Sequence, residues 1–509
     1  MSTIIDLKDL SSKSAEIKPG NTVLLKDGTY SGLTIKISTS GTKDNRITIK
    51  PQNAGKVILT KSCNITINGS YITLANLVLK DGGSSKPAIY IIGNGNRITG
   101  CDVSYSASAT EQMIRIQGKE NRVDHNIFHD WNKSGVWVVV WRPNKTEDYA
   151  LIDHNIFKNR ISTGEDNGLE SIRIGTSSDS LTSSKSMVIQ NQFINCNGEI
   201  EVISNKSGDN IYYGNYMESS EGTLTLRHGN GCIVYKNHFD QKNKENTGGI
   251  RITGENHIVA NNYIENVNGN GTTRVGISIN NGVKNSELNE YFQVKNTQIK
   301  NNIFVNCSND FAIGVQVKTE CVLKPVSSEI SGTISYHSDN SACFSTNSKC
   351  LGSDDMKYTN NIFYAKSLGS TPNNGGIIQK SPSELDLPSM KQKLSQLYSQ
   401  ENAGPNWNTN PEDSEIKSTF VEYYNNLKNK IISEISGTPP IVDDNTGGNT
   451  GGGDPTPQPE TVTIEKIKYD RLLKIEQYAT NIVPHLIYLQ QAISDIAPSL
   501  STLQGVLNS

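Results

Sequence analysis

The 509-residue sequence has no run of about 18 apolar residues, the length that a membrane-spanning helix needs. Its start, MSTIIDLKDLSSKS, lacks the basic segment and apolar core of a secretory signal peptide. The eight cysteines show no CxxC spacing, which argues against a zinc ribbon. Positive charge is not in excess, since 48 Lys and Arg against 51 Asp and Glu leave a net charge of −3. Binding of nucleic acid through global charge is therefore not expected.

Apolar and charged residues are both scarce, at 34% and 19% of the chain. Asn, Ser, Thr and Gly fill the difference, and this composition is typical of turn-rich β structure rather than of a helical enzyme. The cysteines that fall in β-like segments are expected to be small buried residues, namely Cys63, Cys101, Cys196, Cys232 and Cys307. Cys321, Cys343 and Cys350 share one loop-like insertion, where a disulfide and free thiols are both open.

One short pattern recurs along the chain, in which an Asn or Asp is followed within two positions by an aliphatic or aromatic residue. Its copies are centred on Asn76, Asp102, Asn126, Asn155, Asn191, Asn215, Asn237, Asn262, Asn302 and Asn361. Between Asn76 and Asn262 the spacing ranges from 22 to 36 residues, and repetition of this kind indicates a solenoid. The repeated units contain short Val, Ile, Thr, Tyr and Phe runs bounded by turn residues, so they are strands.

We therefore predict an all-β fold, a right-handed parallel β-helix, for residues 1–370. The recurring Asn is expected at a tight turn between sheets. There it can adopt left-handed backbone geometry, and its side-chain amide can hydrogen-bond to the next coil.

The repeat stops after about residue 370, and residues 383–400 and 414–436 have helical patterns. We predict that region 371–438 is helical and packs on the solenoid as its C-terminal cap. Residues 439–460 are rich in Gly, Pro and Asp, which is typical of a flexible linker.

The last stretch, residues 461–509, has apolar residues at an alternating spacing of three and four, which predicts an amphipathic helical tail. Such a tail can form a homo-oligomer or dock a partner. Pro484 and Pro498 interrupt a single coil, so a kinked helical pair that packs on the chain's own body is the alternative.

Four polar segments fall on successive predicted coils, and solenoid geometry would stack them into one surface groove. They are GEDNGLESIRIG, CNGEIEVISNKSG, GTLTLRHGNG and GGIRITG, within residues 164–254. Glu199 and Glu201 are two residues apart, so in a strand both side chains point to the same face. Two adjacent carboxylates repel each other unless a cation lies between them, and calcium prefers such oxygen ligands. Asn167, one coil earlier, can add an amide oxygen, whereas the simpler interpretation of the glutamates alone is a solvated acidic face.

Lys206 and Arg227 are 21 residues apart, close to one coil, so both can reach the same groove. A lysine among cations can act as a general base, and an arginine can stabilise or protonate a leaving oxygen, although a guanidinium is a poor acid. Taken singly, each of these residues fits a surface salt bridge better than a catalytic role.

Arg173 and Arg251 lie in the similar segments ESIRIG and GGIRITG. Spaced arginines, each on its own coil, suit a polymer that bears a carboxylate on every sugar, through bidentate contacts. His228, next to Arg227, can assist binding or can be an ordinary hydrogen-bonded surface histidine. The aromatic residues that can stack on sugar rings are Trp131, Trp137 and Trp141, although Trp137 fits the core equally well.

Together these motifs resemble polysaccharide lyase family 6, the alginate lyase and chondroitinase B family, from about residue 5 to about residue 365. The start PGNTVLLKDGTYSG and the ordered groove segments carry the resemblance. It implies that Asn167, Glu199 and Glu201 bind Ca²⁺. It implies Lys206 as the Brønsted base and Arg227 as the Brønsted acid. The implied substrate contacts are Arg173, His228 and Arg251. It also implies an exported, extracellular protein, although no signal peptide is visible.

The expected function is cleavage of an acidic, uronate-containing polysaccharide, with alginate preferred, by calcium-assisted β-elimination. One alternative is a non-catalytic glycan-binding β-helix adhesin, which the terminal heptads support, and another is a dermatan sulfate lyase. Pectin-type hydrolases need paired aspartates for acid–base work, and the groove segments contain no aspartate cluster.

Overall fold

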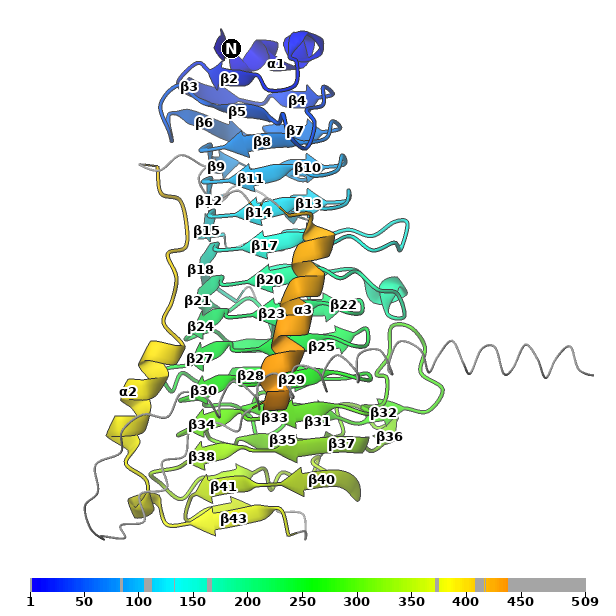
Figure 1. Cartoon of the computed structure of the whole chain (residues 1–509), viewed down its shortest axis with the longest axis vertical. Coiled ribbons are helices and arrows are strands. Elements are labelled where there is room, and N and C mark those ends of the chain that lie inside the picture. The colour runs from blue at the N-terminus through cyan, green and yellow to red at the C-terminus, as the bar shows by residue number, and fades with distance from the viewer. Residues whose placement is uncertain are drawn as a thin grey trace, which may run out of the picture. The chain divides into compact units, whose positions relative to one another are not determined.

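The structure, a computed structural model, describes residues 2–437 apart from 83–85, 105–111, 132, 163–166, 371–374, 408–415 and 417. The predicted linker 439–460 and tail 461–509 lie outside the described residues. Residues 1–441 form one compact unit, in which three long parallel sheets run along the stack of coils (Figure 1).

The strands belong to three sheets, here called sheets A, B and C. Sheet A consists of β1 (Ser2–Ile5), β2 (Thr22–Leu25), β5 (Ile47–Pro51), β8 (Ile72–Ala75), β11 (Arg97–Thr99), β14 (Arg122–Asp124), β17 (Leu151–Asp153), β20 (Met187–Ile189), β23 (Ile211–Tyr213), β26 (Ile233–Tyr235), β29 (Ile258–Ala260), β33 (Gln298–Lys300), β37 (Val326–Ser331) and β40 (Asp355–Thr359). Sheet B consists of β3 (Gly28–Ser31), β6 (Val57–Lys61), β9 (Val78–Gly82), β12 (Asp102–Ser104), β15 (Ile127–His129), β18 (Ile156–Arg160), β21 (Gln192–Cys196), β24 (Tyr216–Glu218), β27 (His238–Asp240), β30 (Tyr263–Glu265), β34 (Ile303–Val305), β38 (Ile334–Tyr336), β41 (Asn361–Tyr364) and β43 (Ile377–Lys380). Sheet C consists of β4 (Thr34–Ile37), β7 (Asn64–Ile67), β10 (Ile89–Ile91), β13 (Gln112–Ile116), β16 (Val136–Val140), β19 (Ile172–Ile174), β22 (Glu201–Lys206), β25 (Gly222–His228), β28 (Thr247–Ile252), β31 (Ile277–Asn280), β35 (Phe311–Val315), β39 (Ala342–Phe344) and β42 (Ser367–Gly369).

Through most of the stack each coil gives one strand to each sheet in the order A, B, C, and each strand pairs in parallel with the equivalent strand of the next coil. This is the parallel β-helix that the repeat predicts. Like residues stack on like inside it, as in the rings of Phe128, Phe157 and Phe193, whose successive centroids are 4.8 and 5.0 Å apart. The five cysteines expected in the core are buried, and none of the eight forms a disulfide.

The recurring asparagines form a hydrogen-bonded ladder at the turn from sheet A to sheet B. In each pair, the side-chain oxygen of one residue accepts from the backbone N–H and the side-chain amide of the residue one coil earlier, along Asn126, Asn155, Asn191, Asn215, Asn237, Asn262 and Asn302. The predicted side-chain bonding is therefore confirmed. The predicted left-handed geometry is wrong for these residues, because the preceding residue adopts it, as at His125 and His154, both with φ of 52°.

The sequence pattern is also displaced by one residue at its start. Asp102 pairs with Val78 on one side and with Ile127 on the other, so Asn76 occupies the place of His125 rather than that of Asn126. Asn76 accordingly has a φ of 61°. The left-handed corner comes first and leaves the next side chain buried, where from Asn126 onward an amide that both donates and accepts satisfies the turn.

The C-terminal region contains the two predicted helices, but they lie along the sides of the solenoid (Figure 1). Helix α3 (Phe420–Gly437) buries Tyr424 and Ile431 against the outer face of sheet A. Helix α2 (Leu387–Leu397) buries Leu394 against the outer face of sheet B. The region therefore does not pack as the predicted end cap in its described part, and strand β43 extends the solenoid past residue 370.

The other helices are short. They are η1 (Leu7–Asp9), α1 (Leu10–Lys13) and η2 (Ser14–Glu16) at the start of the chain, then η3 (Ser177–Asp179) and η4 (Pro382–Glu384). No helix among the described residues is long and apolar enough to cross a membrane. An antiparallel pair, β32 (Gly282–Val283) and β36 (Cys321–Leu323), carries the long loop that follows β31.

Candidate active site

The predicted catalytic and substrate-binding residues all lie on the outer side of sheet C, on four adjacent strands. Arg173 on β19 is in register with Ser204 on β22, which is in register with Thr225 on β25 and then with Arg251 on β28. Lys206, at the end of β22, is in register with His228 on β25. Two small side chains thus separate the two arginines, as the stacking of the groove segments predicts.

Irregular pairing re-aims side chains at this point of the sheet. Register shifts occur between Glu201 and Ile203 on β22 and between Gly222 and Leu224 on β25. A further shift pairs Asn205 with Leu226 but Lys206 with His228, so that Arg227 is the extra residue of a bulge. An extra residue bends the strand and turns its side chain out of the regular alternation. The bulge therefore lets Arg227 and His228, which are adjacent in sequence, both serve the same site.

Three glutamates lie near one another around the start of β22, namely Glu170, Glu199 and Glu201, although their carboxylate oxygens are not all within 4.8 Å of one another. Glu199 accepts a hydrogen bond from the backbone N–H of Leu169 at 3.0 Å. Glu170 is fully buried, and neither of its carboxylate oxygens accepts a hydrogen bond from a described residue. Burial, together with the charges of Glu170 and Glu201, raises the pKa of Glu199 to about 9. Such a cluster is costly for the fold unless positive charge compensates it.

The donor set at this cluster fits the predicted divalent cation. Carboxylate oxygens are the ligands that Ca²⁺ prefers, and the unsatisfied oxygens of Glu170 lie beside the predicted ligand Glu199. The predicted ligand Asn167 is exposed, in the turn that leads to Leu169. Sequence reasoning missed Glu170 because it precedes strand β19, so the alternation argument did not apply to it. The sequence feature that could have identified Glu170 is its place inside the segment NGLESIRIG, between the predicted ligand Asn167 and the predicted substrate contact Arg173.

The cations surround these acids at distances too long for hydrogen bonds. The Nζ atom of Lys206 lies 3.8 Å from Oε1 of Glu170, and a terminal nitrogen of Arg173 lies 3.7 Å from the same oxygen. A terminal nitrogen of Arg251 lies 3.7 Å from Oε1 of Glu201. The Nε atoms of Arg173 and Arg251 are buried without a hydrogen-bond partner among the described residues. The donors of the site are thus largely unused by the fold.

His228 is buried and uncharged. Burial, with the nearby charges of Arg227, Lys206 and Arg251, lowers its pKa to about 2. Its Nδ1 atom has no hydrogen-bond partner among the described residues. The predicted substrate contact by His228 would therefore be that of a neutral imidazole.

A loop that sequence reasoning missed lies over Arg227. The two terminal nitrogens of Arg227 donate to the carbonyl oxygens of Glu290 at 2.9 Å and Asn289 at 3.1 Å. The ring of Tyr291 lies 3.9 Å from the guanidinium carbon of Arg227, and its hydroxyl accepts a hydrogen bond from Arg251 at 3.4 Å. Lys318 anchors the loop by an ion pair with Glu290 at 3.0 Å. The loop falls in an irregular gap of the repeat, so no spacing could identify Tyr291.

Arg274, in the turn before β31, is a second missed residue. Burial lowers the pKa of its guanidinium, with Arg251 as a neighbouring positive charge, and its Nε has no hydrogen-bond partner among the described residues. A Cβ on Gly248 would lie 3.1 Å from Cα of Arg274, and one on Gly269 would lie 1.7 Å from its carbonyl oxygen. Both glycines are therefore needed for the close backbone approach that places Arg274 next to the site.

The predicted tryptophans divide into two groups. Trp131 and Trp137 are fully buried, with the guanidinium carbon of Arg160 at 4.7 and 5.0 Å from their rings, so the stacking of these two on sugar rings is ruled out. Trp141 follows β16 of sheet C and is only half-buried. It alone of the three is accessible to a ligand.

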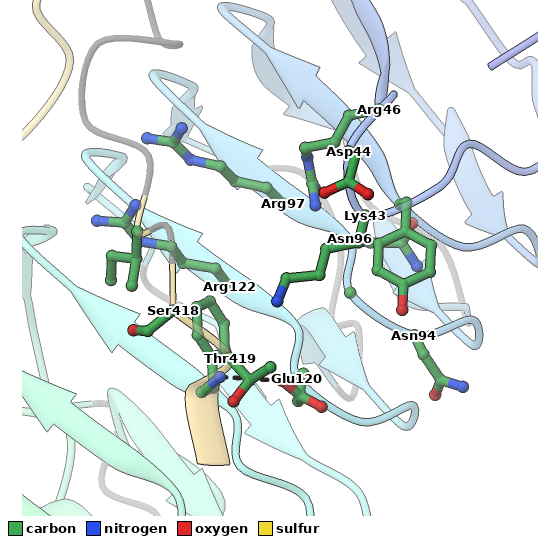
Figure 2. A pocket seen from close by; sticks show the side chains of 14 residues that line it. Lys43, Asp44, Arg46, Asn94, Asn96, Arg97, Glu120, Arg122, Ser418 and Thr419 are labelled. Carbon is green, nitrogen blue, oxygen red and sulfur yellow. Dashed lines mark hydrogen bonds between the residues drawn. The ribbon is translucent and has the colours of Figure 1, made fainter. Parts of the chain in front are cut away.

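A pocket of about 430 Å³ lies elsewhere, between sheet A and the start of α3, where the backbone N–H of Phe420 donates to Glu120 at 2.9 Å (Figure 2). Two of its arginines, Arg97 and Arg122, are already held in bidentate bonds by Asp124 and Asp153 of neighbouring coils. Its cationic character is thus largely neutralised within the fold, unlike that of sheet C.

The fold and this site define a class of protein, a parallel β-helix with acids and cations grouped on the outer face of one sheet. The sequence matches the family model described as Chondroitinase B over residues 4–402, and the chain belongs to this family. A search of curated proteins gave no match.

Solved structures of related proteins cover most of the chain. The PL6 family alginate lyase AlyGC is 29% identical, with a TM-score of 0.66, over 75% of this chain and 53% of that chain. A PL6 alginate lyase in complex with a trisaccharide is 25% identical, with a TM-score of 0.65, over 80% and 95%. A mannuronic acid-specific family 6 lyase from human gut microbiota is 23% identical, with a TM-score of 0.68, over 84% of this chain and 99% of that chain. At this identity the likeness shows the fold alone. The chain spans about half the length of AlyGC.

Proposed function

We propose that the protein is a polysaccharide lyase that cleaves a uronate-containing polymer, alginate, by β-elimination. One observation carries the proposal, namely that Lys206 stands among three carboxylates and several arginines on sheet C without forming a hydrogen-bonded ion pair, its nearest acid oxygen being 3.8 Å away. A structural ion pair closes to hydrogen-bond distance, whereas groups that must engage a substrate remain available to it.

In this proposal Lys206 is the base. Its amine takes the proton from the sugar carbon next to the carboxylate, that electron pair forms the new carbon–carbon double bond, and the bond to the glycosidic oxygen breaks. Arg227 stabilises the negative charge on the leaving oxygen, which then takes a proton from water to become a hydroxyl group. The carbonyls of Asn289 and Glu290 fix its guanidinium, and each terminal nitrogen still has a second N–H to direct at that oxygen.

Glu199 and Glu201, with Glu170 beside them and Asn167 in the adjoining turn, are the proposed ligands of a Ca²⁺ ion. When bound, the cation would neutralise the substrate carboxylate and so make the adjacent proton easier to remove. The proposed substrate contacts are Arg173, His228 and Arg251. Arg274, which precedes β31 on the next coil, extends this set by one coil.

The solved relatives support the choice of polymer. AlyGC and the trisaccharide-bound enzyme are both described as alginate lyases. The family description, chondroitinase B, supports a sulfated uronate polymer as the second candidate. Because such polymers are too large to cross a membrane, we propose that the protein acts outside the cell.

The test offers mannuronate-rich, guluronate-rich and mixed alginate and dermatan sulfate separately, in the presence of Ca²⁺. Ultraviolet absorbance of the new double bond measures the rate. We expect the highest rate with an alginate, and a higher rate with dermatan sulfate would replace the substrate by the second candidate. Absence of the signal with every uronate polymer would overturn the lyase proposal in favour of a binding protein.

A further inference from the structure

Sheet C continues beyond the site toward the N-terminus with its outward side chains in register. Arg173 pairs with Val139 on β16, Val139 with Arg115 on β13, and Arg115 with Tyr90 on β10. The outward row that contains the proposed substrate contacts therefore leads directly to a second arginine, two strands away. With a strand spacing of ~4.8 Å, Arg115 lies roughly 10 Å from Arg173 along the sheet.

Arg115 is held between two aromatic rings at the surface. Its guanidinium carbon lies 5.3 Å from the ring centroid of Tyr90 and 5.0 Å from that of Trp141. Its Nε donates to the side chain of Gln112, and the hydroxyl of Tyr90 donates to the side chain of Gln117. The backbone N–H of Trp141 donates to Ile116 at 2.7 Å, which fixes the third member. The cluster is therefore ordered before any ligand binds.

The same combination occurs a second time in this chain with a structural role. Arg160 lies between Trp131 and Trp137 at similar distances, and all three are fully buried in the fold. Tyr90, Arg115 and Trp141 are instead only partly buried, on the same sheet face as the site. Partly exposed aromatic rings with a fixed cation are the usual composition of a binding surface rather than of a core.

The chemistry of the cluster suits one class of ligand. Aromatic ring faces accept the apolar C–H face of a sugar ring, and a guanidinium binds a carboxylate through two parallel hydrogen bonds. A uronate unit presents both. Because a pyranose unit in an extended chain is similar in length to one strand spacing, a polymer lying across the strands of sheet C places successive units over successive strands.

We propose that Tyr90, Arg115 and Trp141 form a distal subsite that binds a uronate unit of the polymer whose cleavage occurs at Lys206. This inference rests on the proposed function. Three strand spacings, roughly 14 Å, separate β13 from β22. A trisaccharide that spans the cleavage point does not reach the cluster, whereas a longer chain does.

The test compares kcat/KM on the polymer with kcat/KM on a uronate trisaccharide, for the full-length protein and for Arg115→Gln and Trp141→Ala. We expect a loss of about tenfold on the polymer, carried mainly by KM, and a change within about twofold on the trisaccharide. Arg115→Lys keeps the charge but not the planar fork, so we expect an intermediate loss on the polymer. Lys357→Ala, an exposed cation on sheet A, is the matched control and should change neither value.

Unfolding temperatures of all variants accompany the kinetics. Equal losses on both substrates, or no loss on the polymer, would overturn the subsite, as would a loss that only follows a fall in stability. Failure of the wild-type protein to cleave any uronate polymer would be visible before the variants are compared. That outcome would overturn the proposed function, and the subsite with it.

Discussion

Sheets A and C each carry a row of arginines and acids on consecutive coils, yet the two rows are built differently. On sheet A, Arg97 donates to both oxygens of Asp124 at 2.8 and 2.7 Å, and Arg122 donates to both oxygens of Asp153 at 2.8 and 2.6 Å. On sheet C the nearest approaches of Lys206, Arg173 and Arg251 to a carboxylate are 3.7 to 3.8 Å. Similar residues at the same coil spacing thus serve stability in one row and remain available in the other.

The protonation behaviour of the acids follows the same division. Burial opposes ionisation of Asp124 and Asp153, but the charge of Arg122 holds the pKa of both carboxyls below its usual value, with Arg97 adding to the effect at Asp124. At the sheet C cluster, burial and neighbouring acids raise the pKa of Glu199 to about 9. We call the sheet A row of Arg97, Arg122, Asp124 and Asp153 the closed row, because its charges are paired within the fold. We call the sheet C row of Arg173, Lys206, Arg227 and Arg251 with its neighbouring glutamates the open row, because its charges need a cation and a substrate to be paired in the same way.

The largest expected effect is on catalysis at the open row. Lys206→Ala should lower kcat/KM on the cleaved polymer by about a thousandfold, because the general base is lost, and should leave the unfolding temperature nearly unchanged. Rates are read from the absorbance of the double bond, with the exposed Lys357→Ala as the matched control. Turnover within about tenfold of wild type would remove Lys206 from its proposed role.

The closed row should show the reverse result. Asp153→Asn breaks a buried bidentate pair and leaves the guanidinium of Arg122 with the longer contact to Asp124 at 3.5 Å, so we expect a loss of about 3–5 kcal/mol in the free energy of unfolding. At a temperature where this variant is folded, its kcat should remain near the wild-type value. Denaturant titration measures the first quantity, and a selective loss of kcat without loss of stability would contradict the division between the rows.

Tyr291 allows a finer distinction within the open row. Tyr291→Ala removes the ring that lies 3.9 Å from the guanidinium of Arg227, and we expect kcat/KM to fall roughly tenfold. Tyr291→Phe keeps the ring and loses only the hydrogen bond from Arg251, so it should retain most of the activity. Equal losses in both variants would assign the role to the hydroxyl instead of the ring.

The last expected effect is on stability alone and concerns Glu265 on sheet B. Burial opposes ionisation of Glu265, but hydrogen bonds from His238 and from Lys391 of α2 lower its pKa to about 2. A lowered folded-state pKa means that this stability is present above about pH 4.5 and is lost as pH falls toward 2. Glu265→Gln should therefore cost about 2 kcal/mol near pH 6 and little near pH 2.

Thermal unfolding across this pH range checks the prediction. Glu329→Gln, on sheet A and half-buried, is the control that should show no such dependence. A pH-independent difference between Glu265→Gln and wild type would mean that the ionised pair does not stabilise α2 on its sheet.

The sequence allows prediction of those site residues that lie at equivalent positions of successive coils, because the coils place such residues in register. Arg173, Lys206, Arg227 and Arg251 could be brought to one face from coil spacing alone, and the structure places them on adjacent strands. Spacing carries no information about residues in turns and insertions. Glu170, Arg274 and Tyr291 come from such segments, and their approach to the site depends on backbone paths that no periodicity encodes.

The positions of the C-terminal helices escaped prediction for a related reason. Their amphipathic patterns indicate that each buries one face, but not which face of the solenoid receives it. Apolar outward residues of sheets A and B, such as Ile211 and Ile303, provide those surfaces. The corresponding outward positions on strands β19 to β28 of sheet C are arginines and small polar residues, which offer a helix no apolar surface of this kind.

Calorimetric titration of chelator-treated protein with Ca²⁺ tests the difference between the two rows most directly. We expect the wild-type protein and Asp153→Asn to bind a single Ca²⁺ with similar affinity, and Glu199→Gln to bind it at least about a hundredfold more weakly. Undiminished binding by Glu199→Gln, or absence of Ca²⁺ binding by the wild-type protein, would contradict this expectation.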